Sequence, residues 1–345
     1  MTVFSTLYSV FLAVVLAALL CVSVLGSVGG LIPGLDLINH FRPWWLLAAG
    51  LALLVLWPAR RGWRLPLAGL AGLSLLLQAP FVLPTAFASV AEASAQSRAQ
   101  RGAEITLITL NLRYASPSAR AAADFLAESD ADLVFLQEVS ATHLVDLRAR
   151  LAQRLPYAVH CVGGRFCNLA ILSRFPLSDE AASYLGWRKT PPPEPPDLAG
   201  WRKARDLLPS DRRAAAGLIA TAQLGDGGSL SLFNIHLSWP YPAEIQRRQF
   251  RWIAQNLQDL PDGSSLLAGD FNSTPWSFGL KGFDASIQLR RATQGVFSFP
   301  AGTRLPLPIL PIDQVYVGRD IGIESVTRGP DVGSDHYPIV TRLRI

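Results

Sequence analysis

The strongest constraint on the fold of this chain is an uncharged apolar run near its N-terminus. The 23 residues from Val3 to Leu25 contain no acid and no base, and about 20 apolar residues in a helix are enough to cross a bilayer. Two less regular apolar stretches follow, Trp44–Trp57 and Leu65 to about Val90. A cleaved signal peptide is not expected, because the extreme N-terminus has no basic residue and further apolar runs follow. We therefore predict a transmembrane segment of about three helices over residues 1–90.

The expected orientation of this segment follows from its arginines. Arg60, Arg61 and Arg64 lie in the short connection between the second and third predicted spans, and short basic loops stay on the cytoplasmic side. The third span then leads out of the cytoplasm, so everything after residue 90 is expected to lie outside it. If only two of the three stretches crossed the membrane, this orientation would be reversed.

The rest of the chain has the composition of a globular domain on a short tether. A length of 345 residues favours about two domains. Of the formal net charge of +5, three charges come from the first 90 residues, so the remainder does not indicate a nucleic-acid partner by charge alone. Residues 91–103 are small and polar, which is typical of a linker, and residues 104–345 form the expected second domain.

Two features of this domain allow more than one interpretation. Cys161 and Cys167 flank a five-residue loop, which suits a disulfide in an oxidising compartment and equally suits two reduced thiols. The tetrapeptide Gly-Trp-Arg-Lys at 186–189 recurs at 200–203, and a proline-rich stretch separates the two copies. The prolines predict an exposed insertion, either a solvated loop or a surface that stacks a base, binds a phosphate or lies among lipid headgroups.

Apolar periodicity predicts a layered α/β fold for residues 104–345. Many short strand-like runs are interleaved with a few amphipathic segments, which favours two sheets packed face to face with helices outside. We expect helices at 118–129, 142–155 and 244–260, and strands at 105–112, 131–139, 157–162, 168–173, 214–224, 230–236, 266–270, 314–317 and 337–343.

Polar residues stand at the ends of several of these strands and indicate a common pocket. A pocket that contains several carboxylates and two histidines must neutralise them, and a hard divalent cation together with a phosphate is the usual solution. Each histidine or aspartate taken alone has an ordinary structural explanation, whereas the six placements together favour an active site. The six stretches are Thr109-Leu-Asn111, Leu136-Gln-Glu138, Asn234-Ile-His236, Gly269-Asp-Phe-Asn272, Ile312-Asp313 and Gly333-Ser-Asp-His336.

With these motifs, residues 104–345 resemble the endonuclease/exonuclease/phosphatase superfamily, which includes DNase I, abasic-site endonucleases, inositol polyphosphate 5-phosphatases and bacterial sphingomyelinases. Gly-Asp-Phe-Asn at 269–272, followed by Ser-Asp-His-Tyr-Pro-Ile at 334–339, is the most specific part. The resemblance implies a four-layered α/β sandwich and hydrolysis of phosphoester bonds with Mg²⁺, or with Mn²⁺ as an alternative ion. The N-terminal helices are similar to those of bacterial members with a multi-pass inner-membrane anchor and a periplasmic catalytic domain.

The resemblance also implies roles for individual residues. Glu138 matches the metal-binding glutamate, supported by Asn111 and Asp335. The expected catalytic residues are His236, Asp270, Asn272, Asp313 and His336: His236 contacts the scissile phosphate, Asp270 and Asn272 hold the attacking water and phosphate oxygens, and Asp313 orients His336. The expected substrate-binding residues are Arg113, Asn168 and Arg213. Arg113 stands where abasic-site endonucleases carry an aspartate, and the spacing does not decide between Arg212 and Arg213.

These observations favour a nuclease-like, metal-dependent phosphoesterase that acts on phosphodiesters outside the cytoplasmic membrane. A nucleic-acid substrate fits the excess of arginine over lysine, whereas a phospholipid or sphingomyelin-type substrate fits the anchor; an inositol phosphate is a further alternative. A hypothesis of another class is a non-catalytic membrane-anchored binding module. A transporter is disfavoured because the predicted spans contain no acid or base that would mark a pathway. No feature indicates a protein partner.

Overall fold

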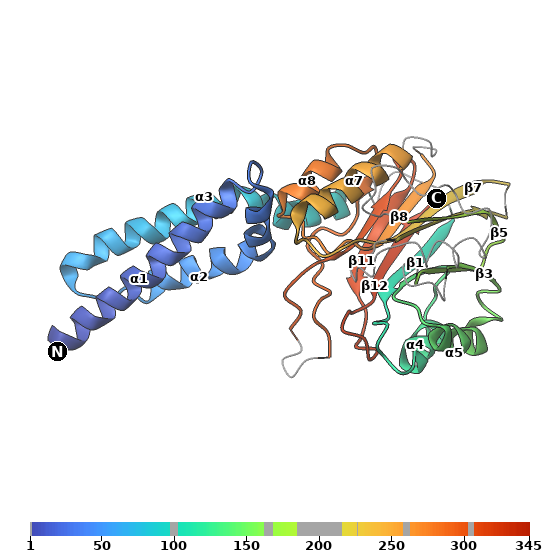
Figure 1. The fold of residues 1–345 in the computed structure, drawn as a ribbon, viewed down its shortest axis with the longest axis horizontal. Coiled ribbons are helices and arrows are strands. Elements are labelled where there is room, and N and C mark those ends of the chain that lie inside the picture. Colours follow the sequence, from blue (N-terminus) through green and yellow to red (C-terminus); the bar gives the residue numbers. More distant parts are fainter. Residues whose placement is uncertain are drawn as a thin grey trace.

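The N-terminal apolar region forms three helices, and most of their length projects away from the rest of the chain (Figure 1). They are α1 (Thr2–Ser27), α2 (Arg42–Leu54) and α3 (Arg61–Gln96), with a 3₁₀ helix, η1 (Pro33–Phe41), between the first two. The computed structural model describes residues 2–96, 103–161, 168–184, 216–225, 227–257, 263–302 and 307–345. Because α1 and α3 run toward the sheets and α2 runs back, the N-terminus and the loop with the arginines lie at the far end of the helical segment (Figure 1).

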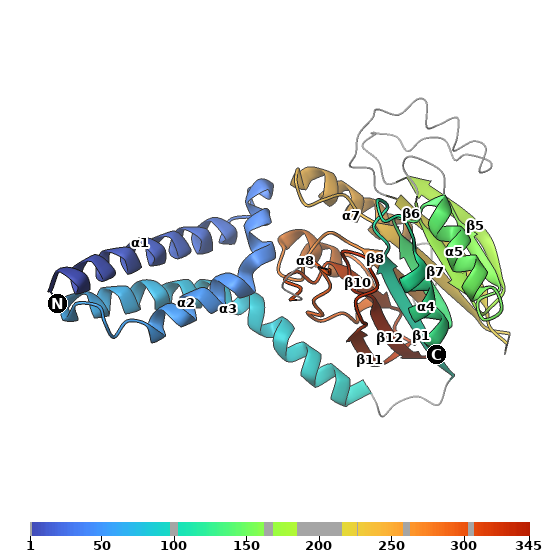
Figure 2. The ribbon, with the colours of Figure 1, turned by 90° about the horizontal axis from the view of Figure 1, so that it is seen from below.

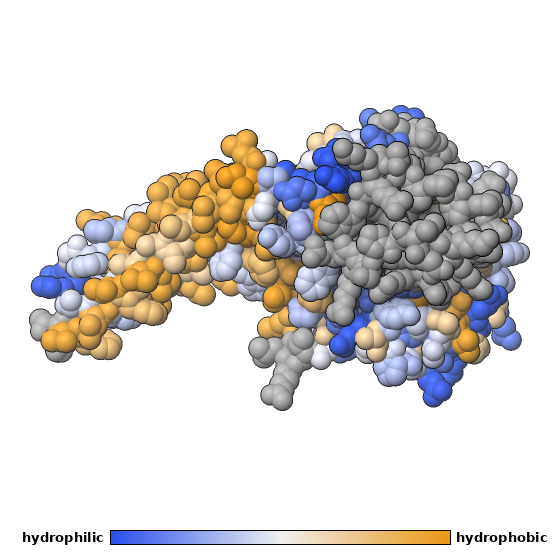
Figure 3. Space-filling model, viewed as in Figure 1, coloured by the Kyte–Doolittle hydropathy of each residue, from blue (hydrophilic) through white to orange (hydrophobic). Residues whose placement is uncertain are grey.

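Within the described residues, two helices are long and apolar enough to cross a membrane, Val3–Ser27 and Arg61–Pro84. Helix α2 has 13 residues, which is about 20 Å and shorter than a hydrocarbon core of about 30 Å. Leu16 and Leu67 are buried between the helices, and apolar side chains cover the outward face of the helical segment seen in Figure 3. How many helices span the membrane stays a prediction, and α3 extends to Gln96, into the stretch predicted as a linker.

Residues 104–345 form two six-stranded sheets, and their order places the ends of distant strands side by side. The first sheet has the order β11-β12-β1-β2-β4-β3, and the second has the order β5-β6-β7-β8-β10-β9. The strands are β1 (Glu104–Asn111), β2 (Leu133–Gln137), β3 (Tyr157–His160), β4 (Ala170–Ser173), β5 (Leu177–Tyr184), β6 (Ala216–Gln223), β7 (Ser229–His236), β8 (Ser265–Asp270), β9 (Arg290–Arg291), β10 (Asp313–Val317), β11 (Gly322–Arg328) and β12 (Ile339–Arg344).

Strand alternation divides the core of this domain into three layers of apolar contacts. In β1, Ile105 and Leu107 point between the two sheets, whereas Ile108 and Leu110 point outward, because successive side chains of a strand face opposite sides. Helices α4 (Arg120–Glu128) and α5 (Ala141–Leu151) cover the outer face of the first sheet, and α7 (Ala243–Leu257) and α8 (Phe278–Asp284) cover the second (Figure 1). The predicted four-layered α/β sandwich is therefore confirmed.

The elements that sequence patterns did not predict lie mainly at the edges of the sheets. β5 and β11 are edge strands, and β11 is only half-buried, so neither has the apolar alternation that a buried face imposes. Helix α8 has only seven residues. The last part of α3 runs beside β11 (Figure 2).

Three sequence features fall wholly or partly outside the described residues. Cys161 is part of a disulfide, but Cys167, the expected partner, lies outside them, and Cys21 is free. The two Gly-Trp-Arg-Lys copies and Arg213 also lie outside the described residues.

Candidate active site

Strand register in the second sheet brings three of the predicted catalytic residues together. β7 pairs with β8 in parallel so that His236 stands opposite Asp270. β10 pairs with β8 on its other side, antiparallel, so that Asp313 also stands opposite Asp270. Three residues that are far apart in the sequence thus form one row across the end of this sheet, with Asp270 in the middle.

The first sheet contributes its residues from the ends of β1 and β2, which are parallel neighbours. Asn111 is the last residue of β1, and Glu138 directly follows β2. The side-chain amide of Asn111 donates one hydrogen bond to Glu138 Oε1 and another to Asp270 Oδ2, both at 3.1 Å. Asn111 therefore joins the two sheets at the site, and the two groups of strand ends meet in one place.

Both predicted histidines point toward the Asp270 carboxylate. His336 Nδ1 lies 2.8 Å from Asp313 Oδ2, and its Nε2 lies 3.8 Å from Asp270 Oδ2. His236 Nε2 lies 3.5 Å from Asp270 Oδ2 and 3.9 Å from Glu138 Oε1. The bond to Asp313 fixes the ring of His336, so that its Nε2 is directed at the centre of the site.

The carboxylates control the charge of this cluster. Burial alone would lower the pKa of His336, but Asp313 and Asp270 outweigh burial and raise it to about 10. Burial is also the main cause that raises the pKa of Asp270, although both histidines oppose it. For Glu138, burial is outweighed by His236 and by hydrogen bonds from Tyr114 N–H and Asn111, so its pKa is lowered. At neutral pH these values favour a protonated His336 and an ionised Glu138.

Backbone strain is concentrated at the same place. Within the described residues, the non-glycine residues with positive φ are Arg113 (58°), Glu138 (55°) and Asn272 (47°). All three belong to the site, and Asn272 also bonds from its side-chain amide to Leu237 O at 2.9 Å. Conformations of this kind are unfavourable for residues with a side chain and are typical of functional sites.

Sequence patterns missed the residues that lock the two sheets together beneath the site. Asn234 and Gln137 are fully buried between the sheets. Gln137 Nε2 donates to Asn234 Oδ1 at 2.7 Å, and Asn234 Nδ2 donates to the carbonyls of Leu136 and Ala170, both at 2.9 Å. Both residues stand inside the strand-end motifs, and a buried amide within an apolar run is the signal that identifies them.

A second support comes from α7 and from the segment before His336. Gln246 of α7 donates to the carbonyls of Phe271 and Asn272, both at 3.1 Å, and so holds the loop after β8. Ser334 Oγ donates to Asn111 O at 2.6 Å and accepts from His336 N at 3.1 Å. These residues position the loops and strand ends that carry the site residues.

The site opens into a pocket of about 250 Å³ that η1 helps to line. Glu138, Asp270, Asn272, Asp335 and His336 form its polar part, and its other walls are Leu37, His40, Phe41, Trp239, Pro240, Phe299, Leu310 and Ile312. η1 was expected to belong only to the membrane segment.

Three contacts fix η1 and the start of α2 against the catalytic domain. His40 Nδ1 accepts from Thr274 N at 3.2 Å, Asp36 accepts from the first N–H groups of α8, and Trp44 Nε1 donates to Ile309 O at 2.9 Å.

The remaining predicted residues lie at the rim or beyond it. Arg113 is exposed, and its Nε lies 3.7 Å from Asp335 Oδ2. Asn168 is beside the site through its backbone, since its carbonyl accepts from Val139 N at 2.8 Å. Arg213 cannot be placed, because it lies outside the described residues.

The donor set of the site fits a hard divalent cation. Ligand atoms of Asp270, Asp313 and His336 lie within 4.8 Å of one another, and Glu138 faces the same space. Because a protonated imidazole cannot bind a metal, the carboxylates are the ligands that this set offers at neutral pH. Asp313 Oδ1 is buried and has no hydrogen-bond partner among the residues that the structure describes. Asn111 directs its N–H groups at the carboxylates, and its oxygen accepts from Arg113 N at 2.8 Å, so here it orients the acidic groups. Clustered carboxylate oxygens are the ligands that Mg²⁺ prefers.

Comparison with known proteins agrees with this geometry. The strand ends of this two-sheet sandwich bring acids, amides and a pair of histidines together. Residues 108–336 match the model of the Endonuclease/Exonuclease/phosphatase family, and the chain belongs to this family. Members of the family are hydrolases that act on phosphoester bonds, and they generally depend on a divalent metal. Among curated proteins, none matches the chain in sequence.

Solved structures support the fold at low sequence identity. A family protein from Bacteroides vulgatus has a TM-score of 0.55 and 17% identity, and covers 70% of this chain and 99% of its own. One from Bacteroides thetaiotaomicron has a TM-score of 0.54 and 16% identity, with 71% and 98% covered. TDP2 from D. rerio, solved with a single-stranded DNA product, has a TM-score of 0.54 and 16% identity, with 70% and 100% covered.

Proposed function

We propose that this protein is a metal-dependent phosphodiesterase whose catalytic domain lies outside the cytoplasmic membrane. The observation that carries the proposal is the convergence of Glu138, Asp270, His236 and His336 in one pocket, with nitrogen–oxygen distances of 3.5 to 3.9 Å between the histidines and the acids. An acid with raised pKa beside a protonated imidazole suits acid–base work on a phosphate ester.

The roles of the residues follow from their charges. A bound Mg²⁺ at Glu138 and its neighbours would polarise the phosphate and offset the charge on the leaving oxygen. Asp270, with its raised pKa, accepts a proton from the attacking water as the water oxygen bonds to phosphorus and the bond from phosphorus to the leaving oxygen breaks. His336 in its protonated form and Asn272 donate hydrogen bonds to phosphate oxygens. Asp313 keeps His336 protonated and oriented.

The orientation of the domain is supported by the arrangement of the helices. Arg60, Arg61 and Arg64 lie at the end of the helical segment that is far from the catalytic domain (Figure 1). Since short basic loops stay cytoplasmic, the catalytic domain lies on the opposite, extracytoplasmic side. Because α1 and α3 run in the same direction, α2 and the residues on either side of it return the chain across the membrane between them (Figure 1).

Turnover of a soluble diester tests the activity. The full-length protein in detergent should hydrolyse bis(p-nitrophenyl) phosphate with Mg²⁺, and a chelator should abolish the reaction. Asp270→Asn and His336→Gln should each lower kcat by two orders of magnitude or more, while Arg248→Gln on the surface of α7 should leave it unchanged. Activity that survives both substitutions, or that is indifferent to chelator, contradicts the proposal. Metal binding without turnover would favour the non-catalytic module.

The apolar wall of the pocket favours an amphiphilic substrate over a nucleic acid. Leu37 and Phe41 come from η1, next to the helices, and Trp239 is 74% exposed at the same mouth. Within the described residues, Arg113 is the cation at this rim, and it is already paired with Asp335. A nucleic acid is normally bound through several phosphate-contacting cations.

A direct competition between substrates tests this second candidate. The wild-type protein in vesicles should hydrolyse a labelled phospholipid faster than it hydrolyses single-stranded or plasmid DNA. Phe41→Ser should slow lipid hydrolysis more than hydrolysis of the soluble diester. An equal loss of rate on both substrates in Phe41→Ser, or faster cleavage of DNA by the wild-type protein, would favour the nuclease-like function instead.

A further inference from the structure

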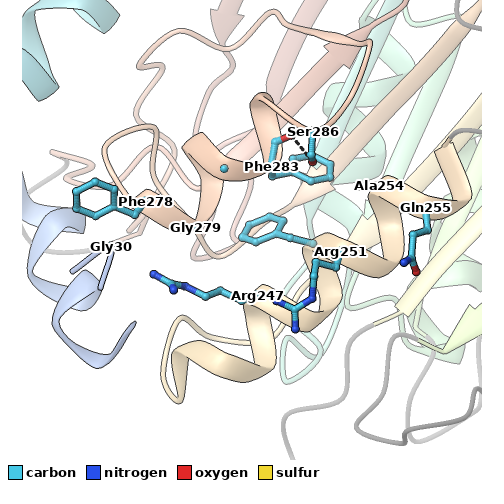
Figure 4. Close-up of a pocket in the computed structure, with 11 residues that line it drawn as sticks. Gly30, Arg247, Arg251, Ala254, Gln255, Phe278, Gly279, Phe283 and Ser286 are labelled. Atoms are coloured by element: carbon cyan, nitrogen blue, oxygen red, sulfur yellow. Dashed lines mark hydrogen bonds between the residues drawn. The ribbon is translucent and has the colours of Figure 1, made fainter. Parts of the chain in front are cut away.

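A second cavity, larger than the catalytic pocket, lies between α7, α8 and the loop after α1 (Figure 4). Its volume is about 530 Å³, and it shares no lining residue with the catalytic pocket. Arg247 and Arg251 line it from α7, Phe278 and Phe283 line it from α8, and Gly30 lines its edge. The proposed reaction uses none of the residues that line this cavity.

The cavity combines positive charge with an aromatic floor. No acid lines it. Arg247 Nη2 donates to Gly29 O at 3.0 Å and lies 3.9 Å from Asp36, so its charge is partly neutralised. Arg251 is exposed and makes no hydrogen bond or ion pair with any residue in the described part of the chain. A free guanidinium beside apolar rings suits a phosphate group that carries an apolar part.

The position of the cavity identifies the kind of molecule that carries this phosphate. Gly30 is three residues past the end of α1, and the next residues, Leu31 and Ile32, are 86% and 55% exposed. Phe278, which lies directly against Gly30 (Figure 4), packs edge-to-face on Phe81 of α3, with ring centroids 5.5 Å apart. The cavity therefore lies where the apolar surface of the helices meets the hydrophilic surface of the domain (Figure 3).

We propose that this cavity binds the headgroup of an anionic membrane phospholipid. The phosphate pairs with Arg251, assisted by Arg247, and the acyl chains extend past Leu31 and Ile32 along the helices. The inference rests on the proposed embedding of α1 and α3 in the membrane, but not on the proposed catalytic reaction. Such a lipid would hold α7, and with it the catalytic domain, at the bilayer surface.

Lipid binding to the full-length protein tests the proposal. In neutral detergent, native mass spectrometry should show binding of phosphatidylglycerol in preference to phosphatidylcholine. Arg251→Gln should weaken phosphatidylglycerol binding by about tenfold, as expected for loss of one charge-assisted contact. The matched control is Arg248→Gln, which removes the same charge from an exposed neighbour on α7 that does not line the cavity.

Filling the cavity gives a second test that does not depend on charge. A Cβ placed at Gly282 meets no atom within 4 Å, so Gly282→Leu should occupy the cavity without disturbing α8. This variant should lose phosphatidylglycerol binding, while its thermal midpoint and its turnover of the soluble diester stay at wild-type values. Millimolar inorganic phosphate should not displace the lipid.

Several outcomes would overturn the inference, and they differ from failure of the proposed activity. Lipid affinity within twofold of wild type in Arg251→Gln and Gly282→Leu would show that the cavity is not the binding site. An equal loss in Arg248→Gln would show a nonspecific charge effect, and displacement by free phosphate would show a simple anion site. If the protein binds lipid through Arg251 but shows no phosphodiesterase turnover, only the catalytic proposal is contradicted.

Discussion

Gly269 offers a sharp test of how the sheet positions the active site. It precedes Asp270 in β8 with φ of +145°, a region that is almost restricted to glycine. A Cβ at this position would lie 2.9 Å from the carbonyl carbon of Ile235 and closer still to its oxygen, whereas ordinary contact begins at 3.4 Å. In Gly269→Ala the neighbouring strand β7 must therefore move by at least half an ångström, next to His236.

The loss of stability in Gly269→Ala has two causes, the unfavourable backbone conformation and the clash with Ile235. The backbone conformation costs roughly 1–3 kcal/mol for a residue with a side chain, and the clash adds roughly 1–3 kcal/mol. We expect the thermal midpoint to fall by about 5 °C or more. Because His236 and Asp270 are opposite partners in this strand pair, turnover should fall by on the order of 100-fold.

Differential scanning fluorimetry and turnover of bis(p-nitrophenyl) phosphate measure both effects on the same protein preparation. Gly282→Ala is the matched control, because a Cβ there meets open space within a helix, where alanine is about 1 kcal/mol more favourable than glycine. A Gly269→Ala protein with a midpoint within about 2 °C of wild type and near-normal turnover would refute the reasoning.

The other predictions concern the metal, the histidine pair and the buried amides. Mg²⁺ should raise the thermal midpoint of the chelator-treated protein, and Glu138→Ala should abolish this increase. Because the pKa of His336 is raised to about 10, its stabilising effect in metal-free protein is fully present below about pH 6.5 and is lost as the pH rises through 10. In Asp313→Asn the thermal midpoint of the metal-free protein should fall less between pH 6.5 and pH 10 than in wild type. The same pH dependence in both proteins would contradict this prediction. Asn234→Leu leaves two buried carbonyl groups without donors, so it should lower the free energy of unfolding by about 3 kcal/mol or more, as measured by chemical denaturation. A loss below about 1 kcal/mol would show that Asn234 does not lock the two sheets together.

The fold was predictable from sequence wherever burial imposes a pattern. β1, β2, β7 and β8 are buried along nearly their whole length because both faces are covered, by the other sheet and by helices. The edge strand β11 escaped prediction because its half-buried face imposes no such pattern. Helix α7 was predicted from its apolar stripe, whereas seven-residue α8 is too short to produce one.

The site was predictable as a set of strand ends, but its walls were not. Asp270 and Asp313 fall into register only through the order of the strands, which the sequence does not state. η1 could not be predicted to line the pocket, because its docking depends on contacts across about 240 positions of sequence, such as His40 with Thr274. The motifs thus identified the strand ends that meet in the pocket, whereas η1, which lines the pocket, belongs to a segment that was expected only to anchor the domain.

In two of the motifs, the residue that belongs to the site also stabilises the turn that follows the strand. Asn111 Oδ1 accepts from Arg113 N–H, and Asp270 Oδ1 accepts from Asn272 N–H, each at 2.8 Å. Asparagine and aspartate make this bond to the residue two positions on, and so stabilise a turn. In both cases the second polar atom of the same side chain lies in the site, where Asn111 Nδ2 donates a hydrogen bond to Asp270 Oδ2. Each of these two side chains therefore turns the chain away from the strand end and places its second polar atom in the site, because the turn lies beside the pocket.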